Sequence, residues 1–453
     1  METSGMFAAL RNDTSFTLAA FPDTTIVKIY AEASLLPVLY DEAESVREYE
    51  YLCNEQLASK LKALLVQKKV DQYLHRSFPY EKNIREIVRM LGQGKSSSGL
   101  WGWWTATDPS MWISLHAIEA LLQAQQSGYT VSLNKTALTD YLVFNLENYQ
   151  GVEKISSLFI LQQLGAKVDY KKYLDSLEKR PVKRSLYEQL RLEELKQRVG
   201  EKVVPDSFLV KQNHTALGNV YWGDDEYTLF NNSIQNTLTM YRLLRGIGGY
   251  SEVLEKIRSY FLEKRKTGHW RNTYESSLIL ETILPDLLAE NDQNGKPALS
   301  IKSDLSVIVQ DFPFSTEVRG GQPLTISKQG KLPVYFTAYQ QYWNKNPDKL
   351  SGNFAVHSTF EHNQQPVSVL KGGNPVTLKV HVSVKADADF VLVEIPIPAG
   401  CSYADKKQPH TNNEVHREYF KNKVSIFCKS LEKGEYSFEV ALLPRYNGIY
   451  TLN

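Results

Sequence analysis

The sequence lacks the features that attract nucleic acid or a membrane. Its 52 lysine and arginine residues are balanced by 51 aspartate and glutamate residues, so no overall field draws in a polyanion or an anionic membrane. No stretch approaches the roughly 18 consecutive apolar residues of a membrane-spanning helix. The start, METSGMFAALRND, has no basic region followed by an apolar run, as an export signal would. We therefore expect no nucleic-acid partner and no direct membrane contact.

Cysteine is also scarce. The chain has 3 cysteines, an odd number, so at least one has no disulfide partner within the chain. Cys401 and Cys428 fall in neighbouring strand patterns and could pair in an oxidising compartment. The acidic run Asp224, Asp225 and Glu226 has no His or Cys at metal-ligand spacing nearby, which favours a solvated loop. We expect neither a metal nor a cofactor.

The length and the aromatic content indicate a folded chain of several domains. At 453 residues it exceeds one ordinary core, and about 150 residues per domain suggests two to four domains. With 26 Tyr and 7 Trp, the composition is that of a globular protein. The last segment, RYNGIYTLN, stops inside a strand-like pattern. We expect the chain to be a fragment of a longer protein, with any targeting signal upstream.

The periodicity of apolar residues divides the chain. Alternation from Ser15 to Leu36 predicts two strands, TSFTLAAF and TTIVKIYAEA, and helical spacing then runs from near Val38 to about Leu288. Apolar helical stretches recur at intervals of 43, 40, 39 and 40 residues, at Trp112, Ile155, Leu195, Ile234 and Tyr274. A period near 40 is typical of one helical hairpin per repeat. Because no polar capping repeat is obvious, we favour a closed ring, an α/α toroid, over an open solenoid.

Strand patterns take over after the loop NDQNGKPA at residues 291–298. Short period-two segments bounded by Gly, Pro and Asn predict a β-sandwich, and a break at residues 343–353 divides this half in two. Strands therefore flank the helical block on both sides, which predicts that the block is inserted into a β-domain. The strands before Val38 should then pair with strands between residues 300 and 342, since a hairpin alone is marginal in water.

One short motif carries chemistry. In Tyr49-Glu-Tyr-Leu-Cys-Asn-Glu-Gln56, Cys53 and Gln56 are three apart at the start of the first long helix. Across a tight turn, the thiolate can attack the side-chain carbonyl of Gln56, expel ammonia and leave an internal thioester, a stored electrophile. Asn54 would suit a turn with positive φ. In an isolated C-x-x-Q, however, the cysteine is more often a small buried hydrophobe.

The surrounding residues extend the motif. Aromatic, x, aromatic, x, Cys, x, Glu, Gln resembles the thioester signature of the alpha-2-macroglobulin and complement family, commonly Tyr-Pro-Tyr-Gly-Cys-x-Glu-Gln in bacterial members. Glu50 and Leu52 replace its Pro and Gly. The segments GLWGWW (99–104), MWISLHAI (111–118) and GHWRNTYESSLIL (268–280) are similar to the family's aromatic loop and thioester-domain helices. IPIPAG (395–400), HR (416–417) and GEYSF (434–438) resemble its last macroglobulin domain.

The resemblance covers about Ile29 to Asn453 and implies a fold of several α and β domains. An α/α toroid, the thioester domain (46–297), would be inserted in a CUB-like β-domain (1–45 and 298–345) and followed by a macroglobulin-type β-sandwich (346–453). It implies a broad-spectrum endopeptidase inhibitor rather than an enzyme, which traps target proteases and couples to their amines covalently. The implied partners include upstream macroglobulin domains, and the implied location is the periplasm or cell envelope.

The resemblance also assigns roles to individual residues. Cys53 and Gln56 would form the thioester, supported by Tyr49, Tyr51, Asn54, Glu55, Trp101, Trp103 and Trp104. The three tryptophans could shield the bond from water, although core packing is an equally good interpretation of each. In complement proteins a histidine accepts the acyl group, but none of His75, His116 or His214 lies in a segment matching that position. We therefore expect direct attack by amines, and His116 to be a core residue.

Two alternative hypotheses of function remain. Polysaccharide lyases also join α/α toroids to β-sandwiches, and Asn213, His214 and Tyr221 offer a conceivable base with its orienting groups. Alternatively, the chain is a member of the same family that has lost its thioester and serves only as a scaffold.

Overall fold

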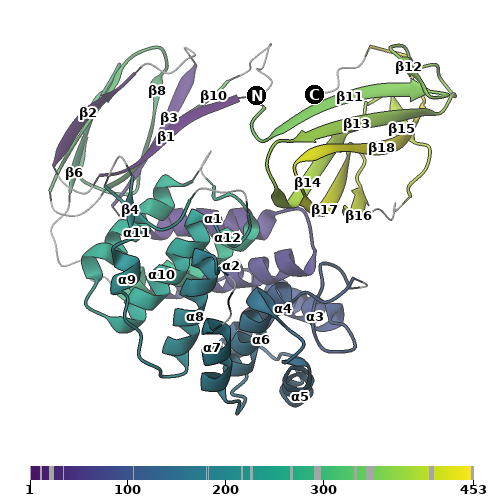
Figure 1. Ribbon diagram of the computed structural model, residues 1–453. Helices are drawn as coiled ribbons and strands as arrows, with labels where there is room; N and C mark the ends of the chain where they lie inside the picture. The colour runs from purple at the N-terminus through teal and green to yellow at the C-terminus, as the bar shows by residue number, and fades with distance from the viewer. Residues whose placement is uncertain are drawn as a thin grey trace. The chain divides into compact units, whose positions relative to one another are not determined.

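The computed structural model describes most of the chain, and the described residues form two compact units. They are residues 2–10, 13–19, 25–33, 35–105, 107–179, 181, 183–215, 218–224, 228–265, 269–289, 297–330, 334–342, 351–407 and 413–449. Unit 1 comprises Met1–Asp224 and Ser233–Lys345, and unit 2 comprises Asp225–Asn232 and Asn346–Asn453. Among the described residues, unit 1 holds the helices, two four-stranded β-sheets and a small two-stranded sheet, whereas unit 2 holds a β-sandwich (Figure 1).

The helical part of unit 1 lies between residues 36 and 289. Its helices are, in chain order, α1 (Leu36–Glu48), α2 (Asn54–Tyr73), α3 (Glu81–Gly94), α4 (Met111–Gln126), α5 (Lys135–Asn145), α6 (Gly151–Gln163), α7 (Tyr170–Glu178), α8 (Leu186–Arg198), α9 (Asp206–Leu209), α10 (Ser233–Ile247), α11 (Ser251–Glu263) and α12 (Thr273–Ala289). Within the described residues, the strands of the helical block are limited to a hairpin of two-residue strands, β4 (Asn213–His214) and β5 (Val220–Tyr221), apart from a single bridge residue at His269. The expectation of a helical block is therefore confirmed, and none of its described helices is both long and apolar enough to cross a bilayer.

The even-numbered helices close on themselves. α2 contacts α4, and the contacts continue through α6, α8 and α10 to α12, which returns to α2. The five apolar stretches that recur about every 40 residues fall on α4, α6, α8, α10 and α12. In α2, sixteen of the twenty residues are buried, because neighbouring helices cover it on several sides. The sequence period thus marks five of the six helices in this closed series of contacts.

Charged side chains join the first and last helices of this ring. The ammonium of Lys62 on α2 is fully buried, 3.0 Å from Glu119 Oε2 on α4 and 3.1 Å from Glu281 Oε1 on α12. Gln123 donates to the other oxygen of Glu281, and Gln163 donates to Glu119, both at 2.8 Å. Because buried charges are tolerated only when they are paired and hydrogen-bonded, this network ties the closure of the ring to one geometry.

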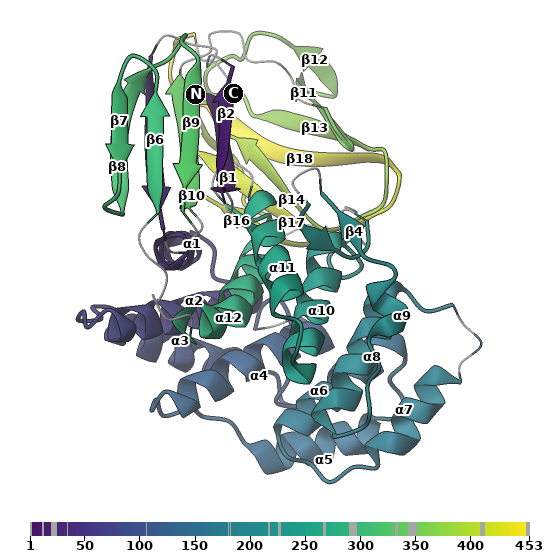
Figure 2. The same ribbon diagram turned by 90° about the vertical axis from the view of Figure 1, so that its left-hand side faces the viewer.

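The β-part of unit 1 combines strands from both ends of the helical block. Two antiparallel four-stranded sheets have the orders β1-β10-β3-β8 and β2-β9-β6-β7; Figure 2 shows β7, β6, β9 and β2 side by side. Their strands are β1 (Glu2–Leu10), β2 (Thr14–Leu18), β3 (Ile26–Glu32), β6 (Ala298–Lys302), β7 (Ser306–Val309), β8 (Phe314–Arg319), β9 (Leu324–Gln329) and β10 (Val334–Tyr342). β3 lies between β8 and β10, and β2 pairs with β9, as the insertion hypothesis requires.

Two details of the N-terminal segment differ from the sequence prediction. β1 was not predicted, because ETSGMFAAL has few β-branched residues, yet it pairs with β10 along its whole length. Its Gly5 permits this approach, since a Cβ atom there would lie 2.9 Å from Tyr339 Cβ. α1 begins at Leu36, so the last ten residues of the segment 1–45, predicted to belong to the β-domain, are helical.

Unit 2 is a sandwich of two antiparallel sheets with the orders β12-β11-β13-β18-β15 and β14-β17-β16. The strands are β11 (Phe354–His362), β12 (Gln365–Val367), β13 (Val376–Val384), β14 (Ala388–Pro396), β15 (Cys401–Tyr403), β16 (Glu414–Tyr419), β17 (Lys423–Leu431) and β18 (Gly434–Pro444). Alternate residues of β13 are buried, as in a strand that covers a core on one face. Cys401 and Cys428 lie on strands of different sheets and are free thiols, so the possible disulfide does not form.

The ion network of the ring can be tested by truncating its buried cation. Lys62→Ala should lower the free energy of unfolding of the helical part by about 3–5 kcal/mol, because two largely covered carboxylates, 19% and 16% exposed, lose their fully buried cation. Lys171→Ala is the control, since the Lys171 side chain is 69% exposed and 4.0 Å from Glu201, and it should change stability by less than about 0.5 kcal/mol. Urea denaturation followed by far-ultraviolet circular dichroism measures both. Equal effects would show that Lys62 is not part of a buried network.

Candidate functional site

Cys53 and Gln56 meet at the N-terminus of α2. Cys53 is the N-cap residue, with extended backbone (φ −66°, ψ 166°), and Gln56 occupies the third helical position. The two form a reciprocal capping box: Cys53 N donates to Gln56 Oε1 at 3.0 Å, and Gln56 N donates to the Cys53 side chain. Cys53 is 0% exposed and Gln56 6%. The thiol and the side-chain amide are therefore held together at one buried helix end.

This helix end suits acyl chemistry. The N-terminus of a helix carries a partial positive charge, which stabilises negative charge on a thiolate or on the oxygen of a tetrahedral intermediate. The Gln56 carbonyl oxygen already accepts a backbone N–H, and such a bond strengthens as negative charge builds on that oxygen. Burial keeps bulk water away from the carbonyl carbon.

Asn54 joins the motif to the tryptophan loop. It is the first residue of α2 and is absent from the residues with positive φ, so the expectation of a left-handed turn at Asn54 is wrong. A capping box needs helical backbone there. Its N–H donates to Trp103 O at 2.9 Å, and its side-chain amide donates to Gly102 O at 3.0 Å. Gly94, at the end of α3, leaves room for this side chain, since a Cβ atom there would lie 2.4 Å from Asn54 Oδ1.

The three tryptophans have different surroundings. Trp101 is fully buried, and its indole N–H donates to Leu91 O at 2.8 Å, so its side chain belongs to the helical core. The backbone carbonyl of Trp103 accepts a hydrogen bond from the N–H of Asn54, the residue after Cys53. The ring centroids of Trp103 and Trp112 are 5.5 Å apart. Trp104 is partly exposed, and its backbone N–H bonds to Thr107 Oγ1. Backbone carbonyls of the loop bind Asn54 and so hold the loop against the motif, and Trp103 is the tryptophan that supplies one of these carbonyls.

The residues before Cys53 form a folded entry to α2. Tyr51 is buried, and its ring meets that of Tyr49 edge to face at 5.5 Å. The ammonium of Lys60, on α2, donates to the backbone carbonyl of Tyr49. Leu52, which stands where bacterial signatures have glycine, is 47% exposed, so its side chain is accommodated at the surface. The chain thus packs the motif with a leucine at this position.

Glu55 lies in a buried polar pocket that the sequence did not reveal. Ser59 Oγ donates to its carboxylate at 2.7 Å, and Thr273 Oγ1, on α12, lies 3.0 and 3.1 Å from its two oxygens. Burial raises the pKa of Glu55 to about 7, and these hydroxyls partly offset the effect. Thr273 was missed because no local pattern links it to Glu55, which lies 218 positions away, and Ser59, one helical turn from Glu55, was not singled out as its partner.

The three histidines considered from the sequence lie in different surroundings. His116 Nε2 lies 2.9 Å from Ser59 Oγ, and the ring is 1% exposed. Burial, followed by the positive charge of Lys62, holds its pKa well below the usual value, so the imidazole is neutral at physiological pH. His75 follows the far end of α2, about 30 Å from Cys53 along a 20-residue helix. His214 is exposed on the β4–β5 hairpin.

The residues of the lyase reading do not converge. Asn213 and Tyr221 are cross-strand partners on the hairpin, and His214 pairs with Val220. Because successive side chains of a strand point to opposite faces, His214 turns away from the other two. Asp225 and Glu226 lie outside the described residues, and Asp224 is exposed. No group of three metal-ligating side chains occurs in the part of the chain that the structure describes.

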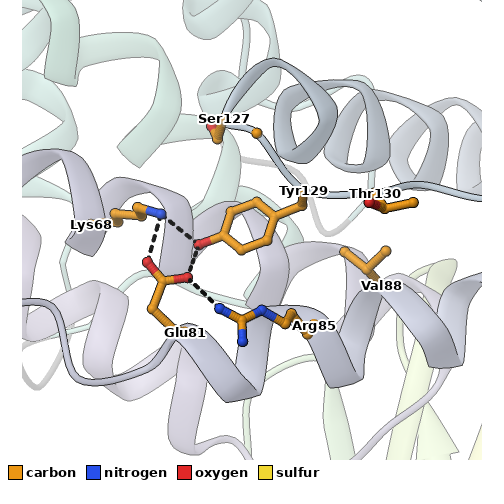
Figure 3. Close-up of a pocket in the computed structure, with 8 residues that line it drawn as sticks. Lys68, Glu81, Arg85, Val88, Ser127, Tyr129 and Thr130 are labelled. Carbon is orange, nitrogen blue, oxygen red and sulfur yellow. Dashed lines mark hydrogen bonds and ion pairs between the residues drawn. The ribbon is translucent and has the colours of Figure 1, made fainter.

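A separate pocket of about 430 Å³ opens farther along α2. Its lining includes Lys68, Glu81, Arg85 and Tyr129 (Figure 3). Glu81 lies 2.7 Å from the Lys68 ammonium, accepts from Tyr129 at 2.7 Å and lies 3.6 Å from Arg85. The charged groups pair with one another, so we interpret them as a structural contact between helices rather than as a binding site.

Comparison with known proteins identifies the last domain. Residues 352–453 match the family model of the bacterial alpha-2-macroglobulin MG10 domain. No curated protein sequence matches the chain at a significant level.

Solved structures extend the similarity of fold over the whole chain. It is similar to Escherichia coli alpha-2-macroglobulin from domain MG7 to the C-terminus, with a TM-score of 0.72 and 16% identity, covering 99% of this chain and 78% of that one. Its fold is also similar to that of Salmonella alpha-2-macroglobulin reacted with methylamine, with a TM-score of 0.71 and 15% sequence identity, and the chain spans 32% of the length of that protein. The comparison with the native conformation of the E. coli protein has the same TM-score, 0.71, and the same sequence identity, 15%, and the chain spans 31% of the length of that protein. At this identity the likeness establishes the fold.

The pocket around Glu55 predicts how stability depends on pH. Its pKa is higher in the folded chain than the ordinary 4.5, so its stabilising contribution is complete below about pH 4.5 and is lost as the pH rises through about 7. Glu55→Gln keeps an acceptor for Ser59 and Thr273 without the charge. Between pH 4.5 and pH 9 the wild type should lose about 2–3 kcal/mol more of its free energy of unfolding than the variant loses.

Urea midpoints measured across this pH range test the pocket. Glu48→Gln, at a carboxylate that is 63% exposed, is the control and should show no comparable divergence. Parallel pH profiles for wild type and Glu55→Gln would mean that the carboxylate is not in a desolvated site.

Proposed function

We propose that this chain traps proteases through an internal thioester between Cys53 and Gln56. Its last domain matches that of the bacterial alpha-2-macroglobulin family, and its fold is similar to the C-terminal part of such a protein. The observation that carries the proposal is the capping box that holds the thiol and the amide together at the buried start of α2. The chain acts as an endopeptidase inhibitor, since each thioester is consumed once and nothing regenerates it. It spans about a third of the full-length relatives, and target proteases are its proposed partners, together with upstream macroglobulin domains.

The chemistry has two steps. The Cys53 thiol attacks the Gln56 amide carbon, the C–N bond breaks, and ammonia leaves with the thiol proton. A lysine amine of a protease then attacks the same carbon, the C–S bond breaks, and the proton from the amine passes to Cys53. The product is an amide between Gln56 and the protease. Neither step needs a metal, an oxidant or a cofactor.

The support residues have distinct parts in this proposal. Asn54 fixes the start of α2 to the tryptophan loop, and Trp103 limits the access of water to the thioester. Tyr49 and Tyr51 hold the entry to the motif, while Trp101 and Trp104 stabilise the loop on either side of Trp103. Glu55, with a pKa near 7, is suited to take a proton from an attacking amine at neutral pH.

The domain architecture follows from the same proposal. The ring of helices at 46–297 is an α/α toroid, and the strands of 1–45 and 298–345 form one CUB-like β-domain into which it is inserted. Residues 346–453 form the macroglobulin-type sandwich. The closed series of helix contacts and the pairing of β2 and β3 with later strands support this division. A periplasmic or cell-envelope location is proposed by analogy with the bacterial family.

Alkylation with and without methylamine tests the thioester. In freshly prepared protein, the Cys53 peptide should resist iodoacetamide and become fully labelled after methylamine treatment, because the amine opens the bond and frees the thiol. Peptide mass spectrometry reads both the label and the methylamide on Gln56. Cys53→Ala should show no methylamide, whereas Cys401→Ala, which removes a cysteine of unit 2, should behave like the wild type.

Heating provides a second readout of the same bond. The backbone nitrogen of Gln56 can attack its own activated carbonyl and cleave the chain before that residue, so two fragments should appear on a denaturing gel. Cys53→Ala should remain whole. If Cys53 is labelled at once, with no methylamide and no fragments, the chain is a scaffold that has lost its electrophile.

A further inference from the structure

Two of the lysines on α2 have carboxylate partners. The Lys62 ammonium lies between Glu119 and Glu281, at 3.0 and 3.1 Å. Lys68, two turns farther along, lies 2.7 Å from Glu81 in the pocket of Figure 3. Each cation is neutralised by an anion on a neighbouring helix.

Lys60 lies on the same helix in a different environment. The residue is 6% exposed, and its ammonium donates to the neutral backbone carbonyl of Tyr49. Among the described residues, no carboxylate lies within ion-pair distance of this ammonium. Burial lowers the pKa of Lys60, and the positive charge of Arg47 lowers it further, whereas the partners of Lys68 raise the pKa of that lysine. A buried lysine beside another cation loses its proton more readily than an exposed lysine, and the neutral amine is a nucleophile.

Lys60 also stands at the position from which it can reach Gln56. Residues four apart on a helix share one face, with Cβ atoms about 5–6 Å apart, and long side chains lean toward the N-terminus. Two contacts agree with this direction: the Gln56 carbonyl turns back to Cys53, and the Lys60 ammonium reaches Tyr49, which precedes the helix. The amine and the acyl carbon therefore belong to the same end of the same face of α2.

We propose, on the basis of the thioester proposed above, that Lys60 is an internal acyl acceptor that forms an isopeptide bond with Gln56 and releases Cys53. The lone pair of the neutral Lys60 nitrogen attacks the Gln56 carbonyl carbon, and the C–S bond breaks. One amine proton passes to the departing sulfur, which becomes the Cys53 thiol. Ammonia has already left during thioester formation, so the atoms balance without a further reactant. The amine has two N–H groups and can keep its bond to Tyr49 while its lone pair attacks.

This reaction would limit the lifetime of the trap. An amine in the same helix competes with every external amine, and well-oriented internal groups reach effective concentrations on the order of 10⁵ M or more. Protonation of Lys60 and its hydrogen bond to Tyr49 slow the attack. A thioester that meets no protease is then converted into an inert cross-link between two side chains of α2, so the chain cannot couple to proteins at random later.

A time course on the full chain tests the proposal. Freshly prepared protein is held in mildly alkaline buffer, alkylated and digested with trypsin, and the peptide that contains residues 53–60 is analysed by mass spectrometry. The expected product has lost one ammonia, carries the alkyl label on Cys53, is not cleaved by trypsin after Lys60, and fragments as a Gln56–Lys60 cross-link.

Two matched variants accompany the wild type. Lys60→Arg keeps a buried cation that can donate to Tyr49 but is not a nucleophile, so the blocked Cys53 thiol should persist roughly tenfold longer or more. Lys68→Arg changes another lysine of α2, one with a carboxylate partner, and should form the cross-link at the wild-type rate. Circular dichroism confirms that each variant is folded.

The other results separate this inference from the proposal on which it rests. Ammonia loss with Cys53 blocked and Lys60 unmodified throughout would leave the thioester standing and overturn the role of Lys60. Hydrolysis of Gln56 to Glu, at equal rates in wild type and Lys60→Arg, would do the same. Unmodified Gln56 with Cys53 labelled from the start would instead reject the thioester itself.

Discussion

The reciprocal hydrogen bonds between Cys53 and Gln56 are the constraint on which the candidate site depends. In an ordinary capping box, a Ser or Thr and a Glu or Gln satisfy two orphan N–H groups of a helix. Here the same arrangement places a thiol against an amide, both buried. Helix capping and acyl chemistry therefore use one geometry, because both need a side-chain carbonyl turned back onto the residue that starts the helix.

The rest of unit 1 holds that helix start in place. α2 lies in a closed series of six helices, and the Lys62 network joins it to α4 and α12. At its first turn, Asn54 bonds to the loop between α3 and α4, and Glu55 bonds to Thr273 on α12. Such a site can be both dry and well ordered, since its polar groups find partners inside the protein instead of water. The consequence is a carboxylate with an unusually high pKa, Glu55, and a lysine, Lys60, beside which the described part of the chain places no anion.

Prediction from the sequence succeeded where the pattern was local and long. The period near 40 found five of the six ring helices, and strand alternation found β2 and β3, because apolar periodicity directly reflects which face of an element is buried. It failed at β1, whose composition is weak and whose strand forms only by pairing with β10, more than 300 residues away in the chain. It failed at Asn54 as well, because the conformation was inferred from residue type, whereas a capping box requires helical backbone at that position.

By itself, the sequence determined which atoms could react: a cysteine three residues before a glutamine, at the beginning of a long helix, with aromatic residues on the approach. Only the tertiary structure decided the environment of those atoms. It placed Trp103 beside the motif, surrounded Glu55 with hydroxyls from two helices, and gave Lys62 and Lys68 carboxylate partners that Lys60 lacks among the described residues. The physical reason is that reactivity depends on burial and on neighbouring charges, and these come from residues far apart in the chain, whereas the motif lies within eight consecutive positions.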